Sequence, residues 1–353
     1  MDKYKEAIKA LNSLIKKSRV HLYKPIQIAE ILYHDRVFHD IDLKDKEDYR
    51  NKSKKWRDEI TDELLGRKCT SSQKFQDNLF EDNAIPPKTL KELGELNIRY
   101  DGAVEAYIYS QFTNKYDQLG NALDYCSKTD KSTFDVKKLI DSFWNEPGLK
   151  RSIDKVYEII VYALFSTLVN ALNMKVEVFI DKNNKDILAE FSDFADKVMC
   201  INSSQISYTN DAKIYRVGIT NASDRGLDMY SNWGPAIQIK HLTLDIDMAQ
   251  DIVDSISSER IVIVCKDADR DVILSLLKQI GWTSHIQSIV TENDLVKWYE
   301  KALRGKYSNV IGDQVLESIK KQIKLEFPSL NKRDDVLGKR EYAIIEIPGW
   351  FSE

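Results

Sequence analysis

Asp228, Gln238 and Lys240 are spaced so that one carboxylate, one amide and one ammonium group could act together. A turn at residues 231–235 separates the carboxylate from the other two groups. If this turn closes an antiparallel hairpin with Tyr230 opposite Ala236, Asp228 lies directly opposite Gln238. Side chains alternate along a strand, so Lys240 lies on the same face as Gln238. The spacing therefore predicts a polar site on one face of the hairpin.

The chemistry of this site depends on what neutralises its charges. Ile237 and Ile239 are expected to point into a core, so the strand would carry apolar and charged side chains in alternation. A charged group on such a strand is costly unless it is paired or bound to a metal ion. Asp228 and Lys240 could therefore form an ordinary ion pair on a solvated face or belong to a metal site. The hairpin alone does not decide between these alternatives.

Another carboxylate, that of Glu158, lies in a segment that is otherwise apolar. Glu158 is the only charged residue between Lys155 and Lys175. Residues 153–172 are predicted to form one long helix that is apolar on nearly every side and therefore buried. A carboxylate in such a helix requires a cation, which would be a metal ion or a neighbouring Lys155 or Arg151.

The composition excludes several classes of protein. A chain of 353 residues with 42% hydrophobic residues can bury a large core, so one large or two modest domains are expected. No apolar run approaches the roughly 20 residues of a membrane span, and the first residues lack a signal-peptide core, so we expect a cytoplasmic protein without a membrane partner. The four cysteines lie far apart and are predicted to be buried thiols. Motifs for nucleotide hydrolysis, dinucleotide binding, serine hydrolysis and zinc proteolysis are absent from the sequence.

Charge is nearly balanced overall but not locally. The formal net charge is −4, whereas residues 50–74 hold eight basic and four acidic residues. A local basic face on an otherwise acidic chain is typical of a protein that binds phosphate groups at one site. A solvated helical face accounts for the same pattern.

Residues 1–150 are predicted to be mainly helical. Apolar residues recur at intervals of three and four along residues 4–15 and 53–65. Shorter amphipathic helices are expected at residues 90–96, 104–112, 119–126 and 136–144. The helix-breaking residues at 146–148 end this region. The region would bind DNA, mediate dimerisation, or support the rest of the protein.

Residues 151–353 are predicted to form an α/β domain with a mixed sheet. Strands rich in β-branched residues are expected at residues 175–180, 213–219, 227–230, 236–244, 261–265, 285–290 and 342–347. Helices are expected at residues 269–280, 292–303 and 312–325, with Thr291 or Asn293 as the N-cap of the second. The predicted fold class is therefore α/β (α+β), preceded by a helical N-terminal region.

The order of these elements resembles the PD-(D/E)XK nuclease core over roughly residues 152–303. A helix that carries Glu158 is followed by a hairpin with Asp228 and the segment QIK, and then by strand, helix, strand and helix. Two residues depart from the pattern of that superfamily. Leu227 stands in place of the proline before the first acid, and Gln238 stands in place of the second acid. The loss of one charge makes Glu158 more important as a compensating carboxylate.

Three segments carry a closer resemblance, to the HaeII-type family of type II restriction endonucleases. They are RGLDMYSNWGPAIQIKHLTL, KWRDEITDELLGRKCTSSQKFQDNLF and VTENDLVKWYEKAL. The resemblance implies a homodimer that cuts double-stranded DNA with Mg²⁺ at a short palindrome of the purine-GCGC-pyrimidine kind. It also implies a prokaryotic restriction-modification system with a cognate DNA methyltransferase as functional partner.

The same resemblance implies the roles of the candidate residues. Asp228 and the carbonyl oxygen of Ile239 would bind Mg²⁺ directly, and Gln238 would bind the ion or one of its waters. Glu158 would bind the metal through water or hold a second ion. Lys240 would orient or deprotonate the attacking water and neutralise developing charge.

Residues for DNA contact are expected in two places. Arg225 and Asn232 flank the hairpin, where they could contact a phosphate or a groove. Basic and polar residues of the front half could follow the DNA backbone or reach base edges: Lys55, Arg67, Lys68, Ser72, Gln73 and Lys74.

Two alternatives remain open at this point. A nuclease with the same core could act as a monomer and nick or repair DNA, making one cut per duplex. A non-catalytic DNA-binding protein would use Asp228 and Lys240 only as an ion pair, and metal would change neither its stability nor its DNA.

Overall fold

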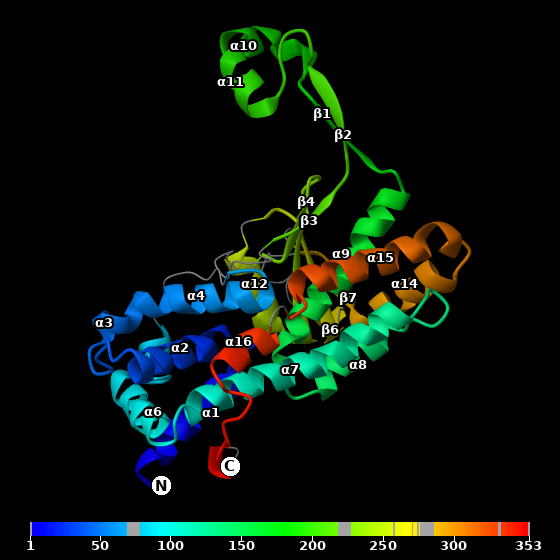
Figure 1. The fold of residues 1–353 in the computed structure, drawn as a ribbon. Helices are drawn as coiled ribbons and strands as arrows, with labels where there is room; N and C mark the ends of the chain where they lie inside the picture. The colour runs from blue at the N-terminus through cyan, green and yellow to red at the C-terminus, as the bar shows by residue number, and fades with distance from the viewer. Residues whose placement is uncertain are drawn as a thin grey trace. The chain divides into compact units, whose positions relative to one another are not determined.

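A computed structural model describes residues 2–68, 78–217, 227–256, 258–269, 271–273, 275, 286–330 and 333–351 (Figure 1). The chain divides into two compact units. Among the described residues, the first comprises those up to residue 159 and those from residue 319 onward, and the second comprises those of 160–217 and 227–318. Residues 319–353, which were expected in the α/β domain, belong to the unit of the N-terminal helices.

Helices build the first unit. Its helices are α1 (Lys5–Lys17), α2 (Tyr23–Val37), α3 (Lys46–Arg50), α4 (Lys52–Leu65), α6 (Pro87–Arg99), α7 (Ala103–Lys128), α8 (Val136–Asn145) and α16 (Arg333–Lys339). The two short helices expected at residues 104–112 and 119–126 are one helix, α7. Phe112, Tyr116 and Leu119 are all buried, so a single apolar stripe continues through the expected gap.

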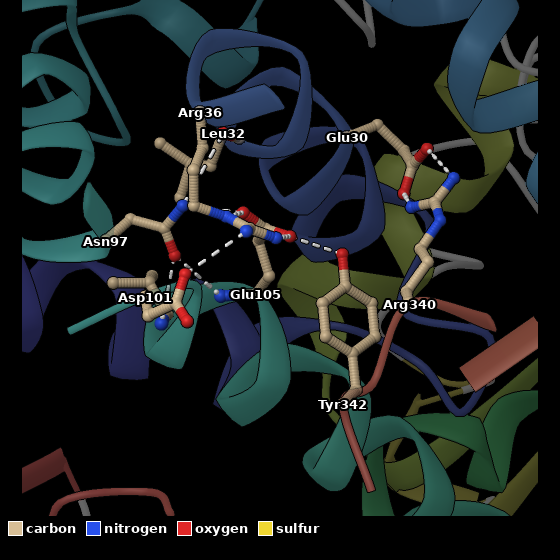
Figure 2. A network of polar contacts seen from close by, with 9 residues as sticks. Glu30, Leu32, Arg36, Asn97, Asp101, Glu105, Arg340 and Tyr342 are labelled. Carbon is tan, nitrogen blue, oxygen red and sulfur yellow. Dashed lines mark hydrogen bonds and ion pairs between the residues drawn. The ribbon is translucent and has the colours of Figure 1, made fainter. Parts of the chain in front are cut away.

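Two buried carboxylates join helices of the first unit to the C-terminal segment (Figure 2). Glu30 of α2 accepts hydrogen bonds from both terminal nitrogens of Arg340, at 2.6 and 3.0 Å. Glu105 of α7 accepts from Arg36 Nε at 2.9 Å, from Asn97 at 2.6 Å and from the hydroxyl of Tyr342. Burial and the neighbouring Glu105 raise the pKa of Tyr342, so its phenol remains a proton donor.

These contacts explain why one expected strand does not form. Residues 342–347 were predicted to be a strand, but they form turns and irregular chain. Tyr342 is buried against the first unit, and its ring stacks on that of Tyr109 at 5.1 Å. Tyr342 therefore packs on the helices of the first unit instead of pairing within a sheet, whereas Ile344 is exposed.

The second unit contains a mixed five-stranded sheet with the order β3-β4-β5-β6-β7. Its strands are β3 (Ile214–Arg216), β4 (Met229–Ser231), β5 (Ala236–Leu244), β6 (Ile261–Ala268) and β7 (Ile286–Thr291). The first three strands pair antiparallel, and the last three pair parallel. The mixed sheet and the restriction-endonuclease-like α/β fold predicted from the sequence are confirmed.

Helices cover this sheet. Helix α12 (Ile246–Ser255) packs Ala249 and Ile252 into a core with apolar residues of β5, β6 and β7. Helix α14 (Glu292–Arg304) contacts β6 and β7, and its Tyr299 donates a hydrogen bond to the carbonyl oxygen of Ile160. Thr291, one of the two expected N-cap candidates, forms a capping box with Asp294 at the start of α14. Helices α9 (Ile153–Ala171) and α15 (Ser308–Glu326) each begin in one unit and end in the other.

A second, two-stranded sheet belongs to the same unit. Strand β1 (Lys175–Phe179) pairs antiparallel with β2 (Ser207–Asp211). Between them lie α10 (Lys185–Glu190), α11 (Ser192–Phe194) and a π-helical turn, Ala195–Met199. Leu188, Ala195 and Ile201 form a small separate core beneath these helices.

Two of the three cysteines that the structure describes are buried. Cys126 and Cys265 are buried free thiols, as predicted, whereas Cys200 is exposed, because it ends the π-helical turn at the surface; Cys69 lies outside the described residues. In the described part of the chain, no helix is long and apolar enough to cross a membrane.

Candidate active site

The hairpin β4–β5 has the predicted register. Tyr230 pairs with Ala236, and Met229 pairs with Ile237. Ser231 donates its backbone amide to the carbonyl oxygen of Pro235 at 3.0 Å, which closes the turn. Continuing this register by one residue brings Asp228 beside Gln238, as expected from the sequence.

Burial along β5 differs from the prediction. Ile237, Gln238 and Ile239 are all buried, so polar and apolar residues do not alternate between solvent and core. The reason is that β5 is a central strand, which pairs with β4 on one side and with β6 on the other. Strands in the parallel part of an α/β sheet are covered on both faces. The candidate site thus begins inside the protein and not on an open sheet face.

Asp228 contacts the backbone of β5 directly. Its Oδ2 accepts a hydrogen bond from the amide of Ile239 at 2.7 Å. The amide and carbonyl of one strand residue point to the same side of the strand, so the carbonyl oxygen of Ile239 also faces the side of Asp228. The carboxylate and this carbonyl oxygen are therefore close to each other.

Gln238 supplies the most informative atom of the site. Its side chain is 3% exposed, and its Oε1 has no hydrogen-bond partner. A buried amide oxygen without a hydrogen-bond partner lowers the free energy of unfolding by about 1–3 kcal/mol. Such an atom therefore suggests that a ligand binds there. Other buried atoms of the described chain also lack partners, among them Tyr49 Oη, but those belong to the first unit. Only Gln238, among these, lies beside a carboxylate and a lysine on one hairpin.

Lys240 lies at a break in the regularity of β5. It pairs with Cys265, but the next registered pair is Thr243 with Asp267, so β5 has one extra residue here. Such a β-bulge changes the direction of side chains and is common beside active sites. Lys240 is partly exposed, and no carboxylate in the described part of the chain lies within ion-pair distance of its ammonium group. The simple Asp228–Lys240 ion pair considered above is therefore not what the structure shows.

The residues present fit a hard divalent cation. Asp228, the carbonyl of Ile239 and Oε1 of Gln238 are all oxygen ligands, which Mg²⁺ prefers. The described residues contain no cluster of three acidic, histidine or cysteine side chains suited to a metal. A site with one carboxylate, one amide and one backbone carbonyl does not require such a cluster.

Glu158 has a cation in the structure, and that cation is a side chain. Its two carboxylate oxygens accept hydrogen bonds from Lys155 Nζ at 2.7 and 2.9 Å, and its side chain is 5% exposed. This is one of the two alternatives that the sequence left open. Glu158 belongs to the first unit and Asp228 to the second.

Asn232, a candidate for DNA contact, holds two parts of the second unit together. Its Nδ2 donates to the carbonyl oxygen of Asp211, and its Oδ1 accepts from the amide of Lys213, both at 2.8 Å. The side chain fixes the link between β2 and β3 to the hairpin turn. Its proposed contact with DNA stays a prediction.

Arg67, another candidate, caps a helix. Its guanidinium donates to the carbonyl oxygens of Leu325 at 2.9 Å and Glu326 at 2.8 Å, the last residues of α15. Carbonyl groups at a helix end lack partners within the helix, so this contact satisfies them. No local pattern signals this role, because the partners lie 258 and 259 residues away along the chain.

The other candidates for DNA contact divide into exposed and undescribed residues. Lys68 is exposed, and Lys55 is exposed beside Glu59 at 3.8 Å. Arg225, Ser72, Gln73 and Lys74 lie outside the described residues. Contact of these residues with DNA stays a prediction.

The fold and the hairpin site define a restriction-endonuclease-like protein. The model of the HaeII restriction endonuclease family matches residues 7–342, and the chain belongs to this family. It is thus an endonuclease of the type II restriction class, which removes the non-catalytic alternative.

Two relatives are similar over nearly their whole length. The type II restriction enzyme HaeII of Haemophilus aegyptius is 55% identical over 344 residues, which cover 97% of this chain and 98% of that enzyme. The type II restriction enzyme NgoBI of Neisseria gonorrhoeae is 56% identical over 332 residues, or 94% of each chain. No solved structure matches the chain.

Proposed function

We propose that this protein hydrolyses phosphodiester bonds in double-stranded DNA with Mg²⁺, and that the β4–β5 hairpin is its catalytic site. The observation that carries the proposal is the buried, unpartnered Oε1 of Gln238 beside Asp228. We further propose cleavage at a short palindrome of the purine-GCGC-pyrimidine kind by a homodimer. A cognate methyltransferase would protect the same site in the cytoplasm of a prokaryotic cell.

The metal ligands in this proposal are Asp228, Gln238 and the carbonyl of Ile239. When bound, a hard divalent cation offsets negative charge that develops on the phosphate during hydrolysis. Asp228 contributes the negative charge that attracts the cation, and its hydrogen bond to Ile239 holds the carboxylate in place. Gln238 contributes a neutral oxygen, so the site carries one charge less than a site with two acids.

Lys240 performs the step that the metal ligands cannot perform. Because no carboxylate of the described chain pairs with it, its ammonium group is available to the substrate. It would donate hydrogen bonds to the attacking water and to a phosphate oxygen, which orients the water and neutralises charge as the transition state forms. The β-bulge next to Lys240 allows this side chain to leave the buried face of the strand.

Glu158 enters this proposal from the resemblance alone. We propose that it supports the metal through a water molecule, as a carboxylate that compensates for the missing second acid. Its hydrogen bonds with Lys155 leave this role to be tested by substitution.

The test is incubation of the purified protein with a sequenced plasmid in Mg²⁺ and, separately, in EDTA. We expect discrete fragments with common ends only in Mg²⁺, and sequencing of the ends reads out the recognition site. The control is the Lys240→Met variant, which should leave the plasmid intact under both conditions. Nicks without double-strand breaks would favour the monomeric repair-type nuclease. Cleavage that persists in EDTA would overturn the metal-dependent mechanism.

A further inference from the structure

Two tyrosines stand side by side on the antiparallel part of the five-stranded sheet. Tyr215 of β3 pairs directly with Tyr230 of β4, and both strands are labelled in Figure 1. Their rings stack with centroids 5.0 Å apart and an interplanar angle of 19°. Tyr215 is 40% exposed and Tyr230 is 44% exposed, so both residues reach solvent. We call these two residues the tyrosine pair.

The tyrosine pair lies on an exposed face of β3 and β4. Met229 and Ser231, which flank Tyr230, are buried, and so is Ile214, which precedes Tyr215. Side chains alternate along a strand, so the flanking residues are enclosed on one face and the tyrosines point outward from the other. The rings therefore cannot turn inward unless buried residues leave the core.

The covered part of the same face begins at the next strand. Ala236 of β5 lies directly opposite Tyr230 and belongs to the core on which α12 packs. Directly opposed residues of an antiparallel pair share a face of the sheet. Because both tyrosines are exposed, the cover over Ala236 does not extend to β3 and β4. The tyrosine pair thus lies at the border between the covered and the open part of this face.

The open part of this face adjoins the candidate active site. Asp228 lies two residues before Tyr230, and its carbonyl oxygen accepts a hydrogen bond from the amide of Val217 at 2.9 Å. The ladder between β3 and β4 therefore continues to Asp228. Two residues of a strand span roughly 7 Å, and alternation predicts that Asp228 and Tyr230 share a face. The tyrosine pair is thus a direct continuation of the strand that carries the carboxylate.

The two tyrosine hydroxyls are free to donate hydrogen bonds. Within the part of the chain that the structure describes, neither hydroxyl has a hydrogen-bond partner. A stacked aromatic pair stabilises neighbouring strands through its rings, and this structural role leaves the hydroxyls unused. A tyrosine hydroxyl can donate to a phosphate oxygen of DNA, and such a contact positions the DNA without reading its sequence.

We propose that the tyrosine pair binds the sugar–phosphate backbone of the DNA strand that the hairpin cuts, and that its hydroxyls donate hydrogen bonds to phosphates beside the scissile one. The inference rests on the proposed function, which places the scissile phosphate at the hairpin. A DNA strand carries one phosphate for about 3.4 Å of helix axis, so a neighbouring phosphate falls within the roughly 7 Å between Asp228 and Tyr230. The tyrosine pair holds the strand and takes no part in the chemical step.

The first experiment removes the hydroxyls and keeps the stacked rings. The double variant Tyr215→Phe/Tyr230→Phe should raise the KM for DNA roughly tenfold and change kcat by less than about twofold, because the lost contacts hold the ground state and the transition state alike. Its unfolding temperature should equal that of the unchanged protein. The matched control is Tyr307→Phe, at a tyrosine of the same unit that is 60% exposed, which should leave the KM unchanged. An unchanged KM in the double variant would overturn the proposal.

The second experiment measures binding of fluorescent duplexes by anisotropy in EDTA, which separates binding from metal-dependent cleavage. The double variant should bind cognate and unrelated duplexes about tenfold more weakly, with an unchanged dependence of the binding constant on salt, because the lost phosphate contacts carry no charge. Weakening confined to the cognate duplex would mean that the tyrosines contact bases and would overturn the phosphate contact.

The same measurements distinguish failure of this inference from failure of the proposed function. If the unchanged protein cuts no DNA but the double variant binds DNA more weakly, the proposed chemistry is overturned and the contact stands. If cutting depends on Mg²⁺ but the double variant binds DNA as the unchanged protein does, the contact is overturned and the chemistry stands.

Discussion

Glu30 and Glu105 in the first unit and Gln238 in the second are all buried, but their surroundings differ. The two glutamates receive hydrogen bonds from Arg340, Arg36, Asn97 and tyrosine hydroxyls (Figure 2). The amide oxygen of Gln238 receives none. Satisfied buried groups specify how helices pack, whereas an unsatisfied group beside a carboxylate retains the capacity to bind something else. The comparison separates polar residues that hold the fold from those that we assign to catalysis.

The largest expected effect comes from Lys240. Lys240→Met should lower the rate of DNA cleavage roughly 1,000-fold, because it removes the group that orients water and offsets charge. Its thermal unfolding temperature should stay close to that of the unchanged protein, because Lys240 contacts no carboxylate of the described chain. Cleavage assays and calorimetry on the same preparation check both statements. Cleavage at the original rate would remove Lys240 from the site.

Arg340→Met should lower the stability of the protein without lowering its rate of DNA cleavage. It leaves the Glu30 carboxylate, which is 2% exposed, without its cation, and should lower the free energy of unfolding by about 3 kcal/mol. Urea denaturation measures this loss, and cleavage per folded molecule at low temperature should be unchanged. The double variant Glu30→Met/Arg340→Met serves as control and should recover part of the stability. If Arg340→Met alone cost nothing, the network would not hold the fold.

Gln238→Leu tests the comparison most directly. Removing an unpartnered buried amide should raise the free energy of unfolding by about 1 kcal/mol and lower cleavage about tenfold. Denaturation and cleavage measured across a Mg²⁺ titration separate the two effects, and Gln238→Glu is the control that restores an oxygen ligand. Loss of stability in the leucine variant would mean that the amide is satisfied in the folded protein.

The effect on cleavage expected at Glu158 is no larger than that expected at Gln238. Glu158→Gln should reduce cleavage about tenfold and shift half-maximal activity to higher Mg²⁺, since the proposed role is that of an outer carboxylate. Lys155→Met is the matched control, because it removes the same ion pair from the other side. Equal Mg²⁺ dependence of both variants and the unchanged protein would leave Glu158 with the structural role alone.

How far the sequence predicts this structure depends on the range of the contacts involved. The hairpin register, the mixed sheet and the cap at Thr291 follow from local spacing and turn chemistry, and all are confirmed. The single helix α7 and the irregular segment 342–347 were missed. Their packing depends on partners far along the chain, as Tyr342 with Glu105 illustrates, 237 residues away.

The register of the hairpin that carries the candidate site was predictable, and the environment of the hairpin was less so. Alternation along β5 predicts that Gln238 and Lys240 share a face, which stays a prediction, and it suggested an open face, whereas Gln238 is buried. Only the pairing of β5 with β6 shows that Gln238 is enclosed, and only burial makes its oxygen informative. Likewise, the sequence offered Lys155 as one partner for Glu158, and side-chain geometry shows that the contact forms.

The return of residues 319–353 to the first unit has a consequence for synthesis of the protein. The second unit, with the hairpin, leaves the ribosome before the segment that supplies Arg340 and Tyr342 to the first. A chain that stops early therefore has Glu30 and Glu105 without these partners, and its first unit cannot complete its core. Completion of the whole polypeptide thus becomes a condition for a stable enzyme, so interrupted chains are directed to proteolysis instead of accumulating as folded nuclease.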